Sequence, residues 1–519
     1  MKQYLLPLFS FCLVWQSFAG HVFDERHTRV FGPFLEWEVE VGAYEGNPFD
    51  LEGVAVFRHE GSGEQIRTGL FHAEEGRWKF RFTATRAGTW RFETYSDHGD
   101  MNGHLGQVRV AEREGDTEGF IARLPEDKWG REGTLRATIP NYLMIPRDPK
   151  SWDEEEEIEY WLDTFIDGHG FTGLHVANVG AAWFDFEVER GRWSENQHLN
   201  SPDINPDPRT FDALEKLILM TEERGGLVHF WLWGDKARTQ TLNSWASSKT
   251  GGINGVADKR LQRYMAARLG PLKGWSVGYG FDLFEWVSDD ELDEWHGYMH
   301  EQMGWPHLLG GRGNKNETYR SQISDKLDYV AYEHHPHLMD YAGWLGVMQD
   351  RPGRLSFSED RFRIRMTDAQ PKDLSGTEET RRLMWDLAMA GGIAAIWGNL
   401  EPRPKQYASR PYANPEQLKT YHRFWFEEGR FRVGVNPKPG MVKTSGARAM
   451  ASDDGDFLIL TINDAERIEF RVDGPTEPLP AIAVDMAKEY AEIPLGETSD
   501  VNTVFEFPYK SDWAVVAGR

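Results

Sequence analysis

Residues 207–233 read DPRTFDALEKLILMTEERGGLVHFWLW, and this stretch holds one complete step of the pattern that decides the fold. An Asp-Pro pair is typical of a helix start, and apolar residues from Leu214 to Met220 recur at helical spacing. Two glycines end the helix, and residues 227–233 form an apolar run typical of a buried strand. A helix followed directly by a buried strand indicates a parallel sheet covered by helices.

The same step recurs along the middle of the chain. Ser-x-x-Glu capping boxes at Ser151, Ser288 and Ser375 indicate helix starts between the expected strands. These strands lie near residues 138–145, 171–178, 227–233, 275–285, 307–312, 328–335, 354–359 and 393–399. Eight strand–helix units in about 300 residues predict a (β/α)₈ TIM barrel, and the alternative is an open three-layer sheet. The lack of a Gly-rich phosphate turn after the first strand weakens that alternative.

Both flanks of this region have the pattern of β-structure. Short runs such as 78–82 and 90–95 alternate apolar and polar residues between Gly-rich turns, which favours an N-terminal β-sandwich. Strand-like runs return after about residue 433, for example at 457–462 and 468–472. We therefore predict an α/β chain of four parts: a signal peptide (1–20), an N-terminal β-sandwich (21–115), a (β/α)₈ barrel (116–432) and a C-terminal β-sandwich-like domain (433–519).

The first twenty residues have the pattern of a secretory signal. Lys2 is the positive start, residues 5–15 are apolar, and Ser17-Phe-Ala19 is a small-x-small cleavage site. The apolar run is too short to span a bilayer. We therefore expect a secreted or periplasmic protein with no membrane anchor after cleavage.

Composition excludes several classes of site and partner. The single cysteine, Cys12, lies inside the predicted signal, so the mature chain would have no disulfide and no cysteine nucleophile. The net charge of −25 argues against nucleic acid as a partner. Motifs for a nucleotide, a flavin or haem are absent from the sequence, so no cofactor is expected. Oligomeric state is left open.

The expected carboxyl ends of the strands carry many polar and aromatic residues. In a (β/α)₈ barrel these ends meet at one mouth, where the chemistry takes place. The residues expected there are Asn178, Trp231, Trp233, Asp235, Asp282, Glu285, Arg312, Tyr332, Glu333, His334, His335, Glu359, Trp397 and Asn399. Aromatic rings beside carboxylates suit sugars, and paired carboxylates are what cleavage of a glycosidic bond requires.

Each of these residues also has a purely structural interpretation. The tryptophans could fill the barrel core, and a carboxylate could cap a helix or pair with an arginine, as Glu359 could with Arg361. The run from Glu333 to His335 suggests a metal site, but no second His or Asp set has recognisable ligand spacing. No metal is therefore predicted.

With these residues placed, the chain resembles a group of secreted bacterial glycoside-hydrolase-like proteins. In these, a β-sandwich precedes a (β/α)₈ barrel related to the large retaining glycosidase clan and to apiosidase-like enzymes. The motifs that carry the resemblance cover most of the mature chain and are specific for architecture more than for substrate. They are residues 47–50 (NPFD), 76–82 (GRWKFRF), 87–92 (AGTWRF), 280–286 (GFDLFEW), 358–363 (SEDRFR) and 389–397 (MAGGIAAIW).

The resemblance also implies catalytic roles. In that clan the acid/base lies at the end of strand four and the nucleophile at the end of strand seven, which implies Glu359 as the nucleophile. Strand four departs from the clan's usual Asn-Glu, because Phe284 precedes Glu285. One alignment makes Glu285 the acid/base, and another makes it Asp282.

The expected function is hydrolysis of a plant or algal poly- or oligosaccharide by two carboxylates, with retention favoured over inversion. Arg361 is a candidate clamp for a uronate or a sulfate. One alternative is a glycan-binding protein without turnover. Another is a polysaccharide lyase that uses Tyr332 and His334 as acid and base.

Overall fold

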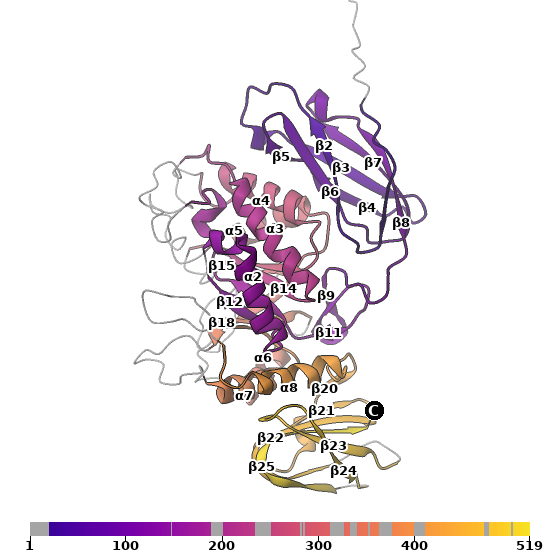
Figure 1. Cartoon of the computed structure of the whole chain (residues 1–519), viewed down its shortest axis with the longest axis vertical. Helices are drawn as coiled ribbons and strands as arrows, with labels where there is room; N and C mark the ends of the chain where they lie inside the picture. The colour runs from indigo at the N-terminus through magenta and orange to yellow at the C-terminus, as the bar shows by residue number, and fades with distance from the viewer. Residues whose placement is uncertain are drawn as a thin grey trace, which may run out of the picture.

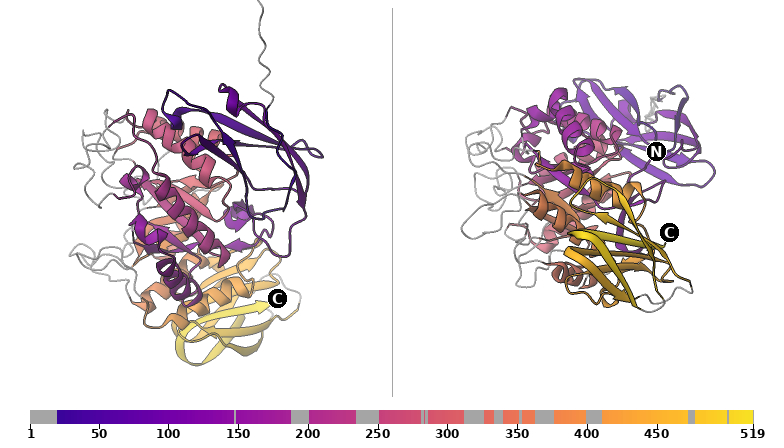
Figure 2. Two further views of the ribbon diagram at one scale, coloured as in Figure 1. Left: turned by 45° about the horizontal axis from the view of Figure 1, so that its top comes forward. Right: turned by 60° about the horizontal axis from the view of Figure 1, so that its bottom comes forward.

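The structure is a computed structural model of the whole chain. It describes residues 20–146, 148–187, 201–233, 251–280, 283, 286–311, 326–332, 340–350, 353–362, 376–398, 411–471, 477–499 and 502–518, of which 350 and 360–362 are described by backbone alone. Three parts follow one another along the long axis of the molecule: a β-structure at the N-terminal end, a barrel with helices in the centre, and a β-sheet at the C-terminal end (Figures 1 and 2).

The N-terminal part is the expected β-sandwich. The strands of its larger sheet lie in the order β1 (Arg26–Arg29), β8 (Leu105–Ala111), β7 (Gly88–Ser96), β3 (Gly53–His59) and β4 (Gln65–Gly69). The smaller sheet has the order β2 (Leu35–Glu40), β6 (Arg77–Phe82) and β5 (Phe71–Glu74). Across the two sheets Phe57 stacks on Phe82 with 4.1 Å between ring centroids. This aromatic core explains the alternation in the sequence, because every second side chain faces the other sheet.

The central part is the predicted (β/α)₈ barrel. Its strands are all parallel, and their order follows the chain: β12 (Asn141–Ile145), β13 (Gly173–Val176), β14 (Leu227–Trp233), β15 (Trp275–Gly280), β16 (Leu309–Gly310), β17 (Tyr329–Tyr332), β18 (Leu355–Phe362) and β19 (Ala394–Trp397), which pairs with β12. Between β16 and β17 the Asp328 amide donates to the Leu309 carbonyl at 3.1 Å. We call this junction the seam of the barrel.

Helices cover the outside of the barrel. They are α1 (Pro149–Asp153), α2 (Glu155–Trp161), α3 (Pro208–Glu223), α4 (Val256–Leu269), α5 (Asp289–Gln302), α6 (Tyr341–Asp350), α7 (Thr377–Met389) and α8 (Pro415–His422). The π-helical turns η4 (Leu162–Asp167) and η10 (Arg423–Glu427) extend α2 and α8. Short 3₁₀ turns are η1 (Pro48–Asp50), η2 (Gly99–Met101), η3 (Pro125–Asp127), η5 (Gly180–Trp183) and η11 (Pro439–Met441). Among the described helices, none is long and apolar enough to cross a membrane.

Of the three capping boxes, the structure confirms the one at Ser288, whose hydroxyl accepts from the Glu291 amide. The prediction of a capping box at Ser151 is wrong. Asp148 caps the helix instead, because the fixed φ of Pro149 already favours the first helical position. For the third box, Ser375 lies outside the described residues, and Gly376 caps α7 without a side-chain hydrogen bond.

A small sheet closes the end of the barrel opposite to the expected mouth. Its strands are β9 (Ile121–Leu124), β10 (Lys128–Arg131) and β11 (Ala137–Thr138). From β10 the buried Trp129 indole donates to the Ser356 carbonyl at the start of β18 at 3.1 Å. Its ring shares a core cluster with inward-facing residues of the barrel strands, such as Tyr142 and Phe357. The barrel interior is therefore filled by side chains.

The C-terminal part is one antiparallel sheet. Its order is β20 (Val435–Pro437), β21 (Arg448–Ser452), β22 (Phe457–Arg471), β25 (Asn502–Gly518), β23 (Pro480–Asp485) and β24 (Glu492–Glu497). Where two strands were expected, at 457–462 and 468–472, the structure has the single strand β22, which ends at Arg471 and has register shifts between Ile462 and Arg467. Bulges of this kind bend a strand, so both halves of β22 contribute to one core. The predicted domain limits at 115/116 and 432/433 stay predictions.

Candidate active site

Glu359 stands at an irregularity in strand β18. Ser358 pairs with Ala395 of β19, but the next pair joins Arg361 to Ile396, so Glu359 and Asp360 form a β-bulge. Bulges re-aim side chains and are frequent next to active sites. The Glu359 side chain is fully buried, at 0% exposure. The chain therefore places a carboxylate inside the barrel, where an apolar residue would ordinarily lie.

Two side chains hold one oxygen of this carboxylate. Tyr329, the first residue of β17, donates its hydroxyl to Glu359 Oε1 at 2.6 Å. His229, from the middle of β14, has its Nε2 3.2 Å from the same oxygen. The second oxygen, Oε2, is buried and has no hydrogen-bond partner among the described residues. A buried polar atom without a hydrogen bond lowers the stability of the fold. A carboxylate with one bonded and one unbonded oxygen is therefore typical of a group that contacts a ligand or takes part in a reaction.

A second layer of polar groups fixes the orientation of His229. Its Nδ1 lies 3.0 Å from the Ser276 hydroxyl of β15. The Tyr142 hydroxyl of β12 lies 3.4 Å from that same serine oxygen. If Nε2 carries the proton toward Glu359, Nδ1 accepts from Ser276, and Ser276 accepts from Tyr142. Every link then has one donor and one acceptor, so the network fixes the tautomer of His229.

Burial and charge keep the tyrosines of this network protonated. Burial raises the pKa of Tyr329 well above its usual value, and the neighbouring Glu359 charge raises it further. Burial likewise raises the pKa of Tyr142. At neutral pH both hydroxyls are therefore hydrogen-bond donors. Tyr329 can stabilise an ionised Glu359 without itself giving up its proton.

Gly278 of β15 makes room for this arrangement. A Cβ atom at that position would lie 2.8 Å from Glu359 Oε1 and 2.6 Å from Cδ1 of Trp231. Such distances are shorter than ordinary contacts, so any side chain here would displace the carboxylate or the indole. The glycine in the strand Trp275–Gly280 is thus explained by the close approach of Glu359.

The predicted aromatic residues are deeply buried. Trp231 faces the barrel interior, where its ring meets His175 edge-on at 4.6 Å. Trp233 packs against Phe184, and the Trp397 indole donates to Asn141 Oδ1 at 2.9 Å. None of the three tryptophans is more than 1% exposed. This placement favours the core-filling interpretation, and a role in sugar stacking stays a prediction.

Two other predicted residues are described. Asn178 follows β13 and is half-buried, and its Oδ1 is buried without a hydrogen-bond partner among the described residues. Tyr332 ends β17 and belongs to the apolar layer between strands and helices. Asn178 therefore remains a good candidate for substrate contact. The position of Tyr332 does not favour its use as the acid of a lyase.

The remaining predicted residues lie outside the described part of the chain. They are Glu285, Asp282, Asp235, Arg312, Glu333, His334, His335 and Asn399, together with the side chain of Arg361. Strand β15 ends at Gly280, earlier than predicted, and the carbonyl of Leu283 accepts from the amides of Trp286 and Val287. The choice between Glu285 and Asp282 as acid/base stays a prediction.

Comparison with solved structures identifies the architecture. A candidate glycoside hydrolase from Bacteroides vulgatus superposes with a TM-score of 0.69 at 15% identity, covering 95% of this chain and 99% of that one. A glycoside hydrolase family 5 protein from Bacteroides vulgatus gives a TM-score of 0.56 at 12% identity, covering 77% and 93%. In fold, the chain resembles glycoside hydrolases. At this level of identity the likeness concerns the fold alone.

Sequence comparisons cover less of the chain. Residues 29–97 match a family model described as a domain of unknown function, DUF5060, which lies within the N-terminal sandwich. No curated protein matches the chain. The glycoside-hydrolase-like resemblance is thus confirmed for the fold, while the links to the retaining clan and to apiosidase-like enzymes stay predictions.

Sequence reasoning missed His229, Ser276 and Tyr329. The signal in the sequence that could have found them is the alternation of side chains along a strand, which tells which residues face the barrel interior. His229 lies two residues before Trp231, so both face the same side of β14, and a histidine within an apolar parallel strand is unusual. In β17 the side chain of Tyr329 faces the barrel interior. The side chain of Tyr332, which the sequence analysis predicts at the mouth, faces the helices.

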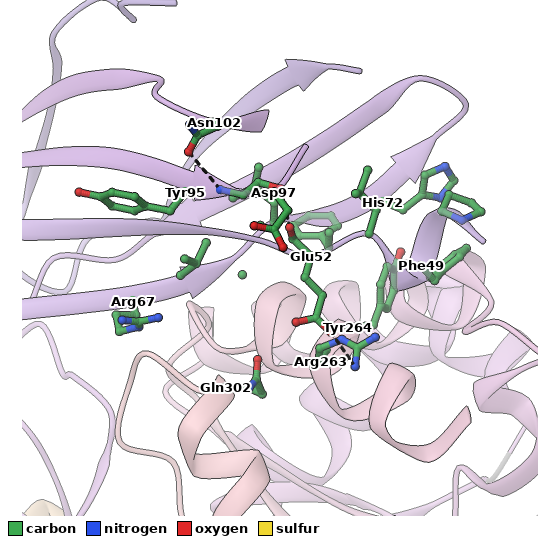
Figure 3. Close-up of a pocket in the computed structure, with 18 of the residues that line it drawn as sticks. Phe49, Glu52, Arg67, His72, Tyr95, Asp97, Asn102, Arg263, Tyr264 and Gln302 are labelled. Atoms are coloured by element: carbon green, nitrogen blue, oxygen red, sulfur yellow. Dashed lines mark hydrogen bonds and ion pairs between the residues drawn. The ribbon is translucent and has the colours of Figure 1, made fainter. Parts of the chain in front are cut away.

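A separate cavity of about 880 Å³ lies between the N-terminal sandwich and the barrel helices (Figure 3). Tyr95, Asp97 and Asn102 line it from the sandwich, and Arg263 lines it from α4. Arg263 Nη1 pairs with Glu52 Oε1 at 3.2 Å across the junction. The cavity therefore has an aromatic ring with amide, carboxylate and guanidinium groups around it.

Proposed function

We propose that this protein is a glycoside hydrolase that cleaves a plant or algal poly- or oligosaccharide, with Glu359 as its nucleophile. The observation that carries the proposal is the Glu359 carboxylate at the β18 bulge, with Oε1 held by Tyr329 and His229 and Oε2 without a partner among the described residues. The overall likeness to solved glycoside hydrolases supports the proposal at the level of the fold.

The proposed reaction proceeds in two balanced steps. Glu359 Oε2 attacks the anomeric carbon, and Glu285 or Asp282 protonates the departing glycosidic oxygen. Water then attacks the glycosyl ester, gives its proton to that same acid/base and releases Glu359 as a carboxylate. Tyr329 and His229 keep Oε1 in place through both steps. The sugar product would retain its anomeric configuration.

We also propose that the protein acts outside the cytoplasm, as a secreted or periplasmic enzyme. This rests on the signal-like residues 1–20 alone. Its substrate would be a carbohydrate, in keeping with the proposed reaction.

The test is turnover of plant and algal glycans by the chain and by Glu359→Gln, with reducing ends as the readout. We expect the variant to lose on the order of 10⁴-fold in kcat, because the amide cannot act as the nucleophile. The matched control is Glu294→Gln on the outer surface of α5, which should keep full activity. Equal turnover by wild type and Glu359→Gln would exclude Glu359 from the mechanism.

Azide rescue separates the nucleophile from a merely structural carboxylate. Glu359→Gly supplied with azide should form a glycosyl azide of inverted configuration, because the small anion enters the space left by the side chain. Proton NMR of the anomeric centre identifies this product and also shows whether the wild-type product retains its anomeric configuration, as expected. An inverted sugar from the wild type would contradict the retaining mechanism.

A second candidate function, glycan binding without turnover, is favoured by the cavity around Tyr95 and Arg263. In that case glycans should bind to wild type and Glu359→Gln equally, without product, and Tyr95→Ala should weaken binding. Turnover by the wild type that depends on Glu359 would contradict it.

A further inference from the structure

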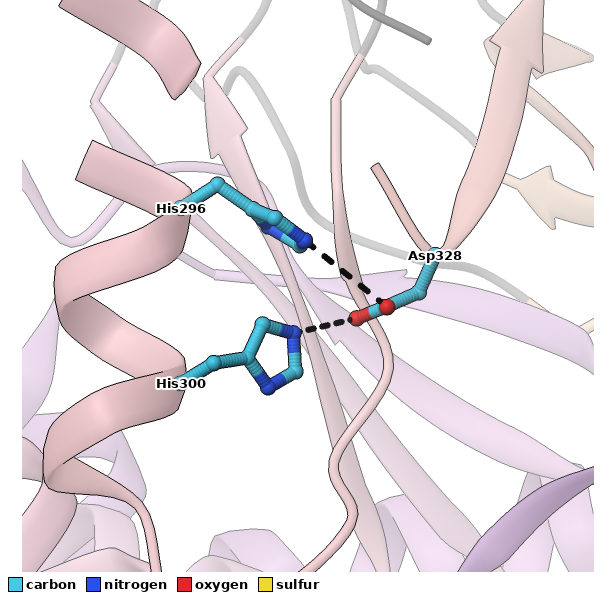
Figure 4. A group of neighbouring side chains, drawn as sticks. All are labelled: His296, His300 and Asp328. Atoms are coloured by element: carbon cyan, nitrogen blue, oxygen red, sulfur yellow. Dashed lines mark hydrogen bonds and ion pairs between the residues drawn. The ribbon is translucent and has the colours of Figure 1, made fainter. Parts of the chain in front are cut away.

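Three potential metal ligands lie together on the outside of the barrel, beside the seam. His296 and His300 are one turn apart on α5, so both face the same side of the helix. Asp328 directly precedes β17 and points toward them (Figure 4). One nitrogen from each histidine and one carboxylate oxygen all lie within 4.8 Å of one another.

The distances between the three side chains are compatible with an ion held between them, and His296 also has a hydrogen bond with the Lys326 backbone. His300 Nε2 lies 2.8 Å from Asp328 Oδ2, but His296 Nε2 is 3.8 Å from Asp328 Oδ1, which is too long for a hydrogen bond. Ligand atoms around a tetrahedral Zn²⁺ stand about 3.3–3.6 Å apart, given bonds of about 2.0–2.2 Å. Small side-chain rotations therefore bring all three atoms to bonding distance.

The surrounding groups hold the first ligands in place. The Tyr279 hydroxyl lies 3.0 Å from Nδ1 of His296, which leaves Nε2 directed at Asp328. The Leu309 amide donates to Asp328 Oδ2 at 2.8 Å. Partners of this kind fix ring orientation and ligand direction in metal sites.

Charge and access favour a cation here. Asp328 and Asp293 contribute negative charge, and Lys326 pairs with Asp293 at 2.5 Å. His300 and Asp328 are partly exposed, at 34% and 25% of their side chains, so an ion and a water ligand have access.

We propose that His296, His300 and Asp328 bind a divalent transition metal ion, with Zn²⁺ the best match to a His₂-carboxylate set and water as the fourth ligand. Bound there, the ion ties α5 to the start of β17 and so reinforces the seam, where β16 contributes only two residues to the barrel. Its role is structural and does not depend on the proposed glycosidase activity.

The test measures Zn²⁺ binding to the full chain, without a histidine tag, by competition with a chromophoric chelator. We expect one ion per chain and a rise in Tm of about 2–5 °C at saturating metal. His300→Ala and Asp328→Asn should each weaken binding at least tenfold and abolish the rise in Tm. His27→Ala, an exposed histidine of the N-terminal sandwich, is the matched control and should bind as wild type does.

Unchanged affinity in both variants would overturn the proposal, because the ion would then bind elsewhere, and so would an absence of binding by the wild type. Far-UV circular dichroism in chelator checks that His300→Ala folds. X-ray absorption of the Co²⁺-loaded wild type gives a test that needs no variant. Two imidazoles and one carboxylate around the ion are expected, and fewer than two imidazoles would refute the site.

Discussion

At the scale of single residues, the central feature is a carboxylate whose two oxygens have different surroundings. Glu359 Oε1 accepts from Tyr329 and from His229, and Oε2 has no partner among the described residues. Such asymmetry fixes the rotation of the carboxyl group and leaves one lone-pair direction available. A nucleophile needs both properties, since its attacking oxygen must be aimed before the substrate arrives.

Tyr329→Phe tests this positioning directly. Losing the hydroxyl removes the shorter of the two hydrogen bonds to Oε1, so we expect kcat/KM to fall by about 10²-fold while the fold is kept. Steady-state kinetics on the best glycan substrate measures the effect. Tyr142→Phe is the control, since among the described residues its hydroxyl contacts Ser276 alone, at 3.4 Å, and does not contact Glu359, so its effect should be much smaller. Equal losses in the two variants would mean that Tyr329 acts through general packing.

At the scale of elements, helix α4 begins with a buried acid. Asp258, in its first turn, is 1% exposed and accepts from the Asn254 amide at 2.8 Å. Burial raises its pKa to about 7, although the hydrogen bond from the Asn254 amide acts to lower it. A raised carboxyl pKa in the folded state means that ionisation costs stability. The deficit is absent below the unfolded pKa of about 4, grows as the pH rises and is complete above about 7.

Asp258→Asn should therefore stabilise the protein at pH 8 by up to about 4 kcal/mol and change it little at pH 4.5. Urea midpoints at the two pH values measure the difference. Asp290→Asn, an exposed acid in the first turn of α5, should shift stability by less than about 0.5 kcal/mol at either pH. A loss of stability at pH 8 in Asp258→Asn would show that the ionised carboxylate is favourable where it lies.

The elements show what local sequence could and could not predict. Parallel barrel strands are apolar on both faces and end at glycines or polar residues, so 227–233 was placed to the residue. The helix start at Ser151 was misplaced because Asp148 and Pro149 form a stronger local signal one turn earlier. The network around Glu359 could not be derived, because it joins five strands that are distant in sequence. Only the register of the closed barrel brings them together.

At the scale of the whole molecule, buried ion pairs join the three parts. Glu215 of α3 accepts from Arg81 of the sandwich at 2.8 Å and from Arg268 of α4 at 2.6 Å. At the other end, Asp512 of β25 pairs with Arg381 and Arg382 of α7 at 2.5 and 2.8 Å. Removing one member of such a set weakens the compensation of the buried charges that remain.

Glu215→Gln should cost about 2–3 kcal/mol, because Arg81 and Arg268 lose their common charged acceptor while Arg81 keeps Glu36 and Arg268 keeps Asp212. The loss is read from the urea midpoint. The control is Asp163→Asn, which breaks the exposed pair with Arg224 and should cost less than about 1 kcal/mol. Similar losses in both variants would mean that the junction between sandwich and barrel is held by its apolar contacts.

The order of strands in the C-terminal sheet also determines the order in which parts of the chain can fold during synthesis. Residues 502–518 form β25, which lies between β22 and β23 and carries Asp512 to α7. While a ribosome is still making those residues, β22 can pair only with β21 and β23 only with β24, and Arg381 and Arg382 of α7 lack Asp512. During synthesis, therefore, the sandwich and much of the barrel can assemble first, and the last contacts of the barrel surface form only after this late strand has emerged.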